Sequence, residues 1–128
     1  MEEIKISDLS VGDWVRYRDR EWQVCSLYKF TEEVGLWRKD SQFCEYVSDL
    51  HPIPLTPEIL EKNGLCVVEE DADFSEYELF GSENFSIFHT KGTLHYRLET
   101  PQASVVCWNV HQLQHALRLA GVEKEIEV

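Results

Sequence analysis

Short extended runs separated by tight turns fill residues 4–53, and this stretch contains no pattern typical of a helix. Within residues 11–28, Val15 and Tyr17 alternate with two arginines, which is the period of a half-buried strand, and Asp19-Arg20 supplies the turn of a hairpin. Two further short runs and a last extended piece, DLHPIPL, follow along the chain. A chain this short protects its strand edges by closing the sheet on itself, so the pattern predicts five strands in a small barrel.

The segment LTPEILEKNG, residues 55–64, begins and ends with residues that are typical of helix termini. Thr56 is a suitable N-cap, and Pro57 occupies a first-turn position where its missing N–H costs nothing. Asn63-Gly64 can end the helix in a left-handed conformation. The helix is short, so its apolar side must pack against other elements to persist.

Beyond this helix and an acidic link, DADFSE, three alternating runs predict an antiparallel meander with one apolar face. Glycine-containing turns, GSE and TKG, separate these runs. The apolar face is expected to include the following residues: Tyr77, Leu79, Phe85, Ile87, Leu94, Tyr96 and Leu98. His89 and His95 lie on either side of the second turn, and strand alternation sends them to opposite faces, where they cannot share a ligand.

Two interpretations of residues 101–121 compete. Either Thr100-Pro101 begins one long helix, or residues 104–107 form a β-rich run and the helix begins only after Trp108. The second is favoured, because Asn109 is a good N-cap and Gln112, three residues later, completes a capping box. Whether residues 101–108 are strand or helix stays open at this point.

The helical phase bears on an apparent metal site, since Cys107, His111 and His115 recur at intervals of four. At 100° per residue the buried stripe is formed by four other residues, namely Val110, Leu113, Leu117 and Ala120. Both histidines therefore face solvent, and a helix that begins at Asn109 leaves Cys107 outside it. No carboxylate or fourth ligand stands nearby in the sequence, so we predict no metal and no other cofactor.

These elements predict an α+β protein in two packed parts. Residues 1–54 form an SH3-like β-barrel, and residues 55–128 form a helix, an antiparallel meander and a C-terminal helix, with the two helices covering the meander. The longest apolar runs are too short to span a membrane, and the acidic start of the chain is unlike a signal peptide, so we expect a cytoplasmic protein without membrane contact.

The net charge and the spacing of the cysteines limit the classes of function that the chain can have. The formal net charge is −12, which opposes non-specific attraction to phosphate unless basic residues are gathered locally. Residues 1–54 carry −4 and residues 55–128 carry −8, so any contact with a polyanion should lie in the first half. The four cysteines form no Cys-x-x-Cys pair and are interpreted as small buried or half-buried hydrophobes.

One candidate binding surface lies in the first half. Trp14, Arg16 and Arg18 are expected on one face of the first strand, and aromatic residues interleaved with bases stack on and neutralise nucleic acid. Further basic residues are expected nearby: Arg20, Lys29, Arg38 and Lys39. The simpler interpretation is an ordinary solvent face, and the overall charge favours it over nucleic-acid binding.

The stretches VGDWVRY, PIPLTPEILEKNGL and VHQLQHALRLAGVE together resemble a family of small uncharacterised proteins encoded by Bacteroidetes genomes and their phages or prophages. The resemblance spans most of the chain, with DADFSE and TPQAS as departures. It implies the two helix starts given above and singles out His111, Gln112 and Gln114 as signature residues of unknown role. It implies no established activity.

No phosphate-binding loop, nucleophile elbow or framed carboxylate pair stands in the sequence, so we predict a protein that is not an enzyme. The leading hypothesis is an accessory or interaction protein of phage or mobile-element origin, acting through a protein partner. The alternative hypothesis is a nucleic-acid-binding module that uses the basic and aromatic face of the barrel.

Overall fold

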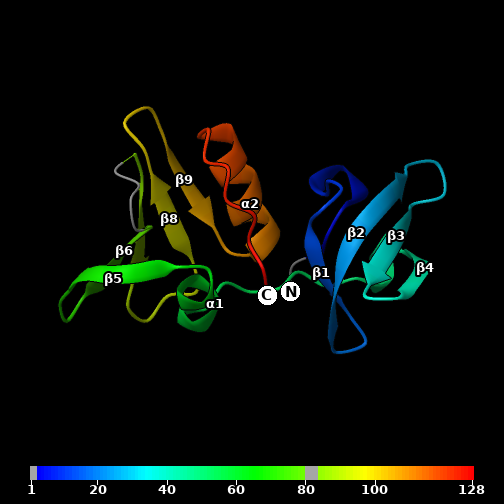
Figure 1. The fold of residues 1–128 in the computed structure, drawn as a ribbon, viewed down its shortest axis with the longest axis horizontal. Helices are drawn as coiled ribbons and strands as arrows, with labels where there is room; N and C mark the ends of the chain where they lie inside the picture. The colour runs from blue at the N-terminus through cyan, green and yellow to red at the C-terminus, as the bar shows by residue number, and fades with distance from the viewer. Residues whose placement is uncertain (1–2, 80–83) are drawn as a thin grey trace. The chain divides into compact units, whose positions relative to one another are not determined.

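The computed structural model describes residues 3–79 and 84–128 of this α+β chain (Figure 1). By their contacts the residues divide into two compact units, Met1–Ile53 and Pro54–Val128. Each unit holds one antiparallel sheet, of four strands in the first and five in the second. Within the described ranges, no helix is long and apolar enough to cross a bilayer.

The first unit is a meander in which each strand pairs with the next. Its strands are β1 (Trp14–Tyr17), β2 (Arg20–Tyr28), β3 (Glu33–Arg38) and β4 (Ser41–Tyr46). Two 3-10 helices, Ile6–Asp8 and Val47–Asp49, stand before β1 and after β4. The predicted first hairpin is confirmed, but its turn lies one residue earlier than predicted, at Arg18 and Asp19, whose φ angles are 49° and 62°, and Arg20 begins β2.

The predicted fifth strand of this unit is wrong. DLHPIPL begins in the second 3-10 helix, and its only pairing with β1 is an isolated antiparallel bridge between His51 and Arg16. In that bridge each backbone N–H donates to the other residue's carbonyl, at 2.8 and 2.9 Å. The prolines at positions 52 and 54 lack the N–H groups that a longer ladder needs.

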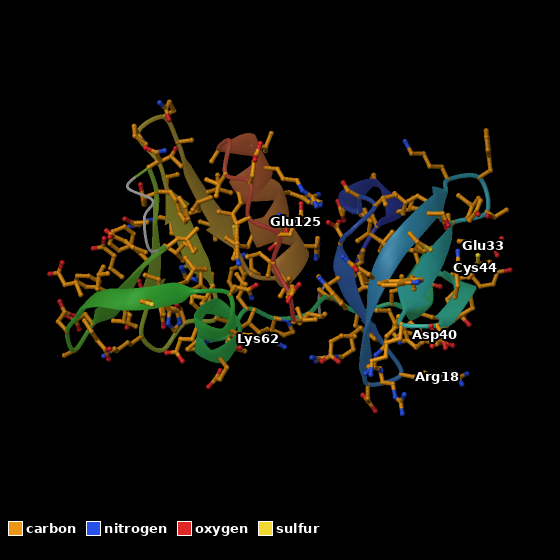
Figure 2. The ribbon with its side chains drawn as sticks, viewed as in Figure 1. Arg18, Glu33, Asp40, Cys44, Lys62 and Glu125 are labelled. Carbon is orange, nitrogen blue, oxygen red and sulfur yellow. The ribbon has the colours of Figure 1, made fainter. Side chains whose placement is uncertain are left out.

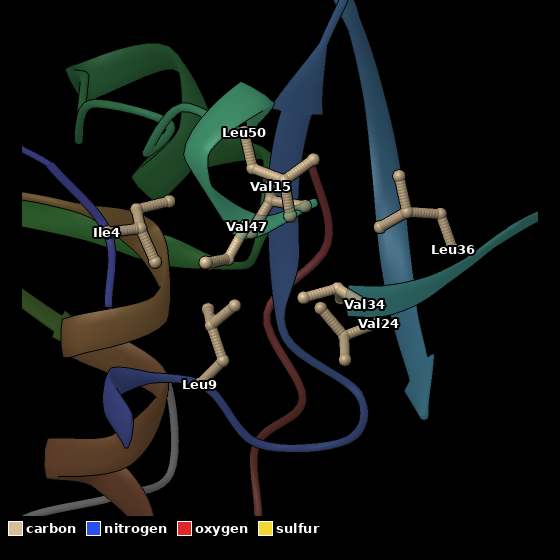
Figure 3. Packing of buried hydrophobic residues seen from close by; sticks show 8 residues of the cluster. All are labelled: Ile4, Leu9, Val15, Val24, Val34, Leu36, Val47 and Leu50. Carbon is tan, nitrogen blue, oxygen red and sulfur yellow. The ribbon is translucent and has the colours of Figure 1, made fainter. Parts of the chain in front are cut away.

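The core of the first unit is aliphatic. It consists of eight buried residues, shown in Figure 3: Ile4, Leu9, Val15, Val24, Val34, Leu36, Val47 and Leu50. Half-buried aromatic rings extend the core, and Trp22 meets Phe43 edge-on at a ring-centroid distance of 4.7 Å. Because Val34 and Leu36 are both buried, β3 has one face turned fully into the core.

The second unit combines two helices with a larger sheet than the sequence predicts. Its elements are α1 (Pro57–Lys62), β5 (Leu65–Glu70), β6 (Phe74–Leu79), β7 (Ser86–Thr90), β8 (Tyr96–Glu99), β9 (Ser104–Cys107) and α2 (Val110–Leu119). The strand order is β5-β6-β7-β8-β9, so β5 and β9 extend the predicted meander on both sides. Helix α1 packs beside β5 and α2 beside β9. The predicted turn at residues 81–83 lies outside the described residues.

Both helix starts are confirmed. The Thr56 hydroxyl accepts a hydrogen bond from the N–H of Ile59 at 3.2 Å, with Pro57 in the first turn. Asn109 caps α2, and the Gln112 side chain accepts from the N–H of Asn109 at 3.2 Å, completing the capping box. Residues 104–107 form β9, so the interpretation with a late helix start holds.

Several burial predictions are wrong. Ala120 follows the last helical residue and is exposed, whereas Ala116 is buried in its place. Leu94 lies in the turn before β8 and is exposed, so the apolar face of that run begins at Tyr96. Among the cysteines only Cys107 is buried and Cys25 is half-buried. Cys44 and Cys66 are exposed because each belongs to the solvent side of a strand.

The expectation that both histidines of α2 face water is also wrong. His111 is only 4% exposed and His115 is half-buried. The chain after α2 runs back along the helix, and the Gln114 side chain forms hydrogen bonds with the backbone of Lys124 and Ile126. Helical phase alone does not reveal such burial, because it does not show what packs against the other sides of the helix.

Candidate functional site

The best candidate for a site is the solvent side of β1–β4, which we call the outer face. Strand register places twelve residues on it: Trp14, Arg16, Glu21, Gln23, Ser26, Tyr28, Glu33, Gly35, Trp37, Gln42, Cys44 and Tyr46. Exposed aromatic residues gathered on one sheet face are uncommon in a protein without a partner, since large apolar patches usually mark interaction sites.

One row of this face holds two tryptophans. Trp14 on β1 pairs with Gln23 on β2, which pairs with Trp37 on β3, which pairs with Gln42 on β4. Trp37 is 44% exposed, and Trp14 is half-buried. The row thus presents indole surface flanked by neutral amide groups, without a charged side chain in the register.

A second row holds two tyrosines around a carboxylate. Tyr28 on β2 and Tyr46 on β4 both pair with Glu33 on β3. The tyrosines are 50% and 57% exposed, and Glu33 is half-buried. This row joins aromatic surface to a negative charge, a combination suited to a cation.

Gly35 on β3 lies between the two rows. A β-bulge between Val24 and Ser26 brings Cys25 and Ser26 to its side, and a methyl group on Gly35 would overlap Ser26 Oγ and lie 3.1 Å from Cys25 Sγ. Cys44 is the partner of Gly35 on β4. Gly35 is itself buried, because the side chains of Ser26 and Cys25 occupy the space where its own side chain would stand.

Most basic residues of the first unit gather at one end of its sheet, where the acidic residues Asp19, Glu21 and Asp40 also lie. Successive antiparallel strands turn back at alternate ends, so the β1–β2 and β3–β4 turns share one end of the sheet. Five of the seven basic residues of this unit lie at or next to these turns: Arg16, Arg18, Arg20, Arg38 and Lys39. In Figure 2, Arg18 and Asp40 lie towards this end, and Glu33 and Cys44 lie towards the other.

The predicted set of Trp14, Arg16 and Arg18 is only partly brought together. Trp14 and Arg16 share the outer side of β1, but Arg18 lies in the turn, with its guanidinium carbon 5.3 Å from the centroid of the Tyr17 ring. Arg16 faces its cross-strand partner Glu21, with Nη2 and Oε1 3.5 Å apart. Lys29 was expected near them but lies in the β2–β3 turn, at the opposite end of the sheet.

Sequence reasoning missed Trp37, Tyr28, Tyr46 and Glu33. The signal was present, since strand alternation alone places Trp37 with Gly35 on one side of β3, and Tyr46 with Cys44 on one side of β4. What the sequence does not reveal is the register that aligns three strands into rows. That register is shifted by the bulge at Cys25.

The signature residues of α2 have structural partners. The Gln112 side chain accepts from Trp108 and Asn109 N–H groups at 2.7 and 3.2 Å. Gln114 is buried, accepts from the N–H of Ile126 at 2.6 Å and donates to the carbonyl of Lys124 at 2.9 Å. The buried His111 ring lies 6.0 Å from that of His115, centroid to centroid. Among the described residues, no group of three or more metal-ligating side chains is close enough to hold an ion.

A hollow of about 540 Å³ also opens in the first unit. Its apolar lining includes Ile4, Val47 and Leu50, and its polar lining includes Lys5 and His51, which are both exposed. Solvated polar groups of this kind are not held in a fixed arrangement for a ligand. The outer face is therefore the stronger candidate.

The chain was compared with protein-family models, curated proteins and solved structures, and none of them matches it.

Proposed function

We propose that this chain is a non-enzymatic interaction protein whose first unit is a small SH3-like barrel that docks a protein partner on its outer face. Two features support the barrel. A 3-10 helix follows β4, and the chain then returns to β1 through the backbone bridge of His51 and Arg16. Such a return is how a short meander covers its first edge.

One observation carries the binding proposal: Trp37, Tyr28 and Tyr46 are all exposed on one sheet face. Tyrosine and tryptophan are enriched at protein interfaces and dominate their binding energy, because each buries a large rigid surface at a small entropic cost. Together with the resemblance of the sequence to proteins of phages and prophages, this supports an accessory role in a mobile element, acting in the cytoplasm.

The test is quantitative affinity capture from the native host. A tagged wild-type chain is compared with a double variant, Trp37→Ala with Tyr46→Ala, and with a control, Leu119→Ala, which removes an exposed apolar side chain from α2. We expect that the wild type and the control capture the same protein and that the double variant captures at least tenfold less of it. Removing two aromatic side chains from an interface should weaken the binding free energy by more than about 1.4 kcal/mol. Equal capture by all three chains would contradict the proposal.

A second candidate function, nucleic-acid binding, is favoured by one observation. The two turns at one end of the sheet gather five basic residues, and Trp14 and Trp37 lie in the adjoining row of the outer face. Stacking on aromatic rings beside basic groups is how single strands are bound without sequence preference. The pairing of Arg16 with Glu21 and the net charge of −12 reduce that attraction, so this function ranks second.

Fluorescence anisotropy with single-stranded DNA and RNA distinguishes the two functions. Nucleic-acid binding predicts an affinity that falls steeply with salt and is lost in the double variant Arg18→Glu with Lys39→Glu. Lys29→Glu, at the opposite end of the sheet, is the matched charge control and should bind like the wild type. Absence of binding at low salt would remove this second function.

A further inference from the structure

The tyrosine row of the outer face, Tyr28, Glu33 and Tyr46, has the layout of a site for one flat cation. Direct neighbours on antiparallel strands have Cβ atoms about 5 Å apart, and residues two strands away are about 9.5 Å apart. Tyr28 and Tyr46 therefore stand on either side of Glu33 on the same face of the sheet. Half or more of each tyrosine is exposed, so both rings are accessible from solvent.

The negative charge of this row is that of Glu33. Among residues 3–79 and 84–128, Glu33 forms no ion pair. The basic residues of the unit lie mainly at the other end of the sheet, and the β2–β3 turn next to the row carries one base, Lys29, and one further acid, Glu32. A cation at this position would meet a carboxylate and two ring faces, and no competing positive side chain within the row.

Guanidinium fits this combination better than ammonium does. It is planar, stacks on aromatic faces, pairs with a carboxylate through two parallel N–H···O bonds, and is less strongly hydrated than an ammonium group. We propose that the row of Tyr28, Glu33 and Tyr46 binds an arginine side chain of the partner protein. The inference rests on the proposed function, because it takes the outer face as the docking surface. It specifies which side chain of the partner binds at one position of that surface.

The test is an NMR titration of the full-length ¹⁵N-labelled chain with three capped tripeptides, glycine-X-glycine, in which X is arginine, citrulline or lysine. Citrulline keeps the shape of arginine and removes its charge. The arginine peptide should produce saturable shifts of the amides of Tyr28, Glu33 and Tyr46, and the citrulline and lysine peptides should bind more weakly. Glu33→Gln and Tyr46→Leu should each weaken the arginine peptide about two- to fivefold, as expected for one exposed ion pair or one cation–π contact.

Leu119→Ala is the control, since it removes an exposed apolar side chain from α2 in the second unit and should leave the arginine affinity unchanged. Equal binding of the citrulline or lysine peptide, or shifts that avoid the tyrosine row, would overturn the assignment. If the partner is still captured through Trp37 while the arginine peptide causes no shift, this inference fails and the proposed function stands. If the arginine peptide binds at the row and no partner depends on the outer face, the docking proposal fails alone.

Discussion

The side-chain amide of Asn63 and the backbone of Glu127 are joined by two reciprocal hydrogen bonds, each 2.7 Å long. Asn63 is buried at the end of α1, and its amide also donates to the carbonyl of Ile59 at 2.8 Å. One residue therefore ends the first helix and fastens the last residues of the chain.

Asn63→Ala should lower the free energy of unfolding by about 1–3 kcal/mol, because it removes the three hydrogen bonds that the buried Asn63 amide makes to the backbone of Ile59 and Glu127. Urea denaturation followed by circular dichroism measures this change. Lys62→Ala is the control, since its exposed ammonium contacts the carbonyl of Val128 at 2.8 Å and should contribute less than about 0.5 kcal/mol. Equal effects of the two substitutions would contradict the account of the tail.

Gln114→Ala should release the tail locally while α2 persists. The amides of residues 124–127 should lose hydrogen-exchange protection, because Gln114 supplies the acceptor for Ile126 and the donor for Lys124. Hydrogen–deuterium exchange read by peptide mass spectrometry resolves this segment. Protection that stays at the wild-type level in the tail would show that packing, and not the amide, holds it.

The buried thiol of Cys107 should make the fold sensitive to alkali. Burial raises the pKa of Cys107 from 9.0 to about 11, and burial together with nearby Tyr77 raises the pKa of Tyr96 from 10.0 to about 12. Both groups are neutral in the folded state, and the unfolded chain loses these protons at lower pH. Stability is therefore complete below pH 9 and falls as pH rises from 9 to 12.

The contribution of Cys107 to this fall is separable. Cys107→Ala should flatten the decline between pH 9 and 11 and leave the decline above pH 10 that Tyr96 causes, in a series of urea titrations. Cys66→Ala, which removes an exposed thiol, should keep the wild-type profile. An unchanged slope in Cys107→Ala would contradict the role of this thiol.

Gly35→Ala should destabilise the first unit by about 1–3 kcal/mol, since the added methyl group overlaps Ser26 Oγ. Ser26→Ala removes that oxygen, so the double variant should recover part of the loss. Thermal unfolding of the four chains in a double-mutant cycle gives the coupling between the two positions. Additive effects would show that the close approach at the bulge does not restrict Gly35.

Local signals in the sequence were sufficient for the helices and the first hairpin. Thr56, Pro57, Asn109 and Gln112 act within one helical turn, so their roles follow from spacing alone. The burial of His111 and the hydrogen bonds of Gln114 with the tail involve residues outside the helix, which no local pattern reveals. The same limit explains why the role of Gln114 was not foreseen.

The candidate site was less accessible to sequence reasoning than the fold. Alternation identified Trp14 and Arg16, but the grouping of Tyr28, Glu33 and Tyr46 depends on the pairing of three strands and on the bulge at Cys25. A shift of one residue in register would send these side chains to the other side of the sheet. The packing of the whole core determines the register of strands that are far apart in the sequence.

Photo-crosslinking in the native host tests the docking surface most directly. The photoreactive residue p-benzoylphenylalanine is placed singly at Trp37 or Tyr46 on the outer face, or at Val106, which is exposed on β9 of the second unit. We expect a covalent adduct with the same partner protein when the photoreactive residue replaces Trp37 or Tyr46, and no adduct when it replaces Val106. An adduct from position 106 alone would contradict it.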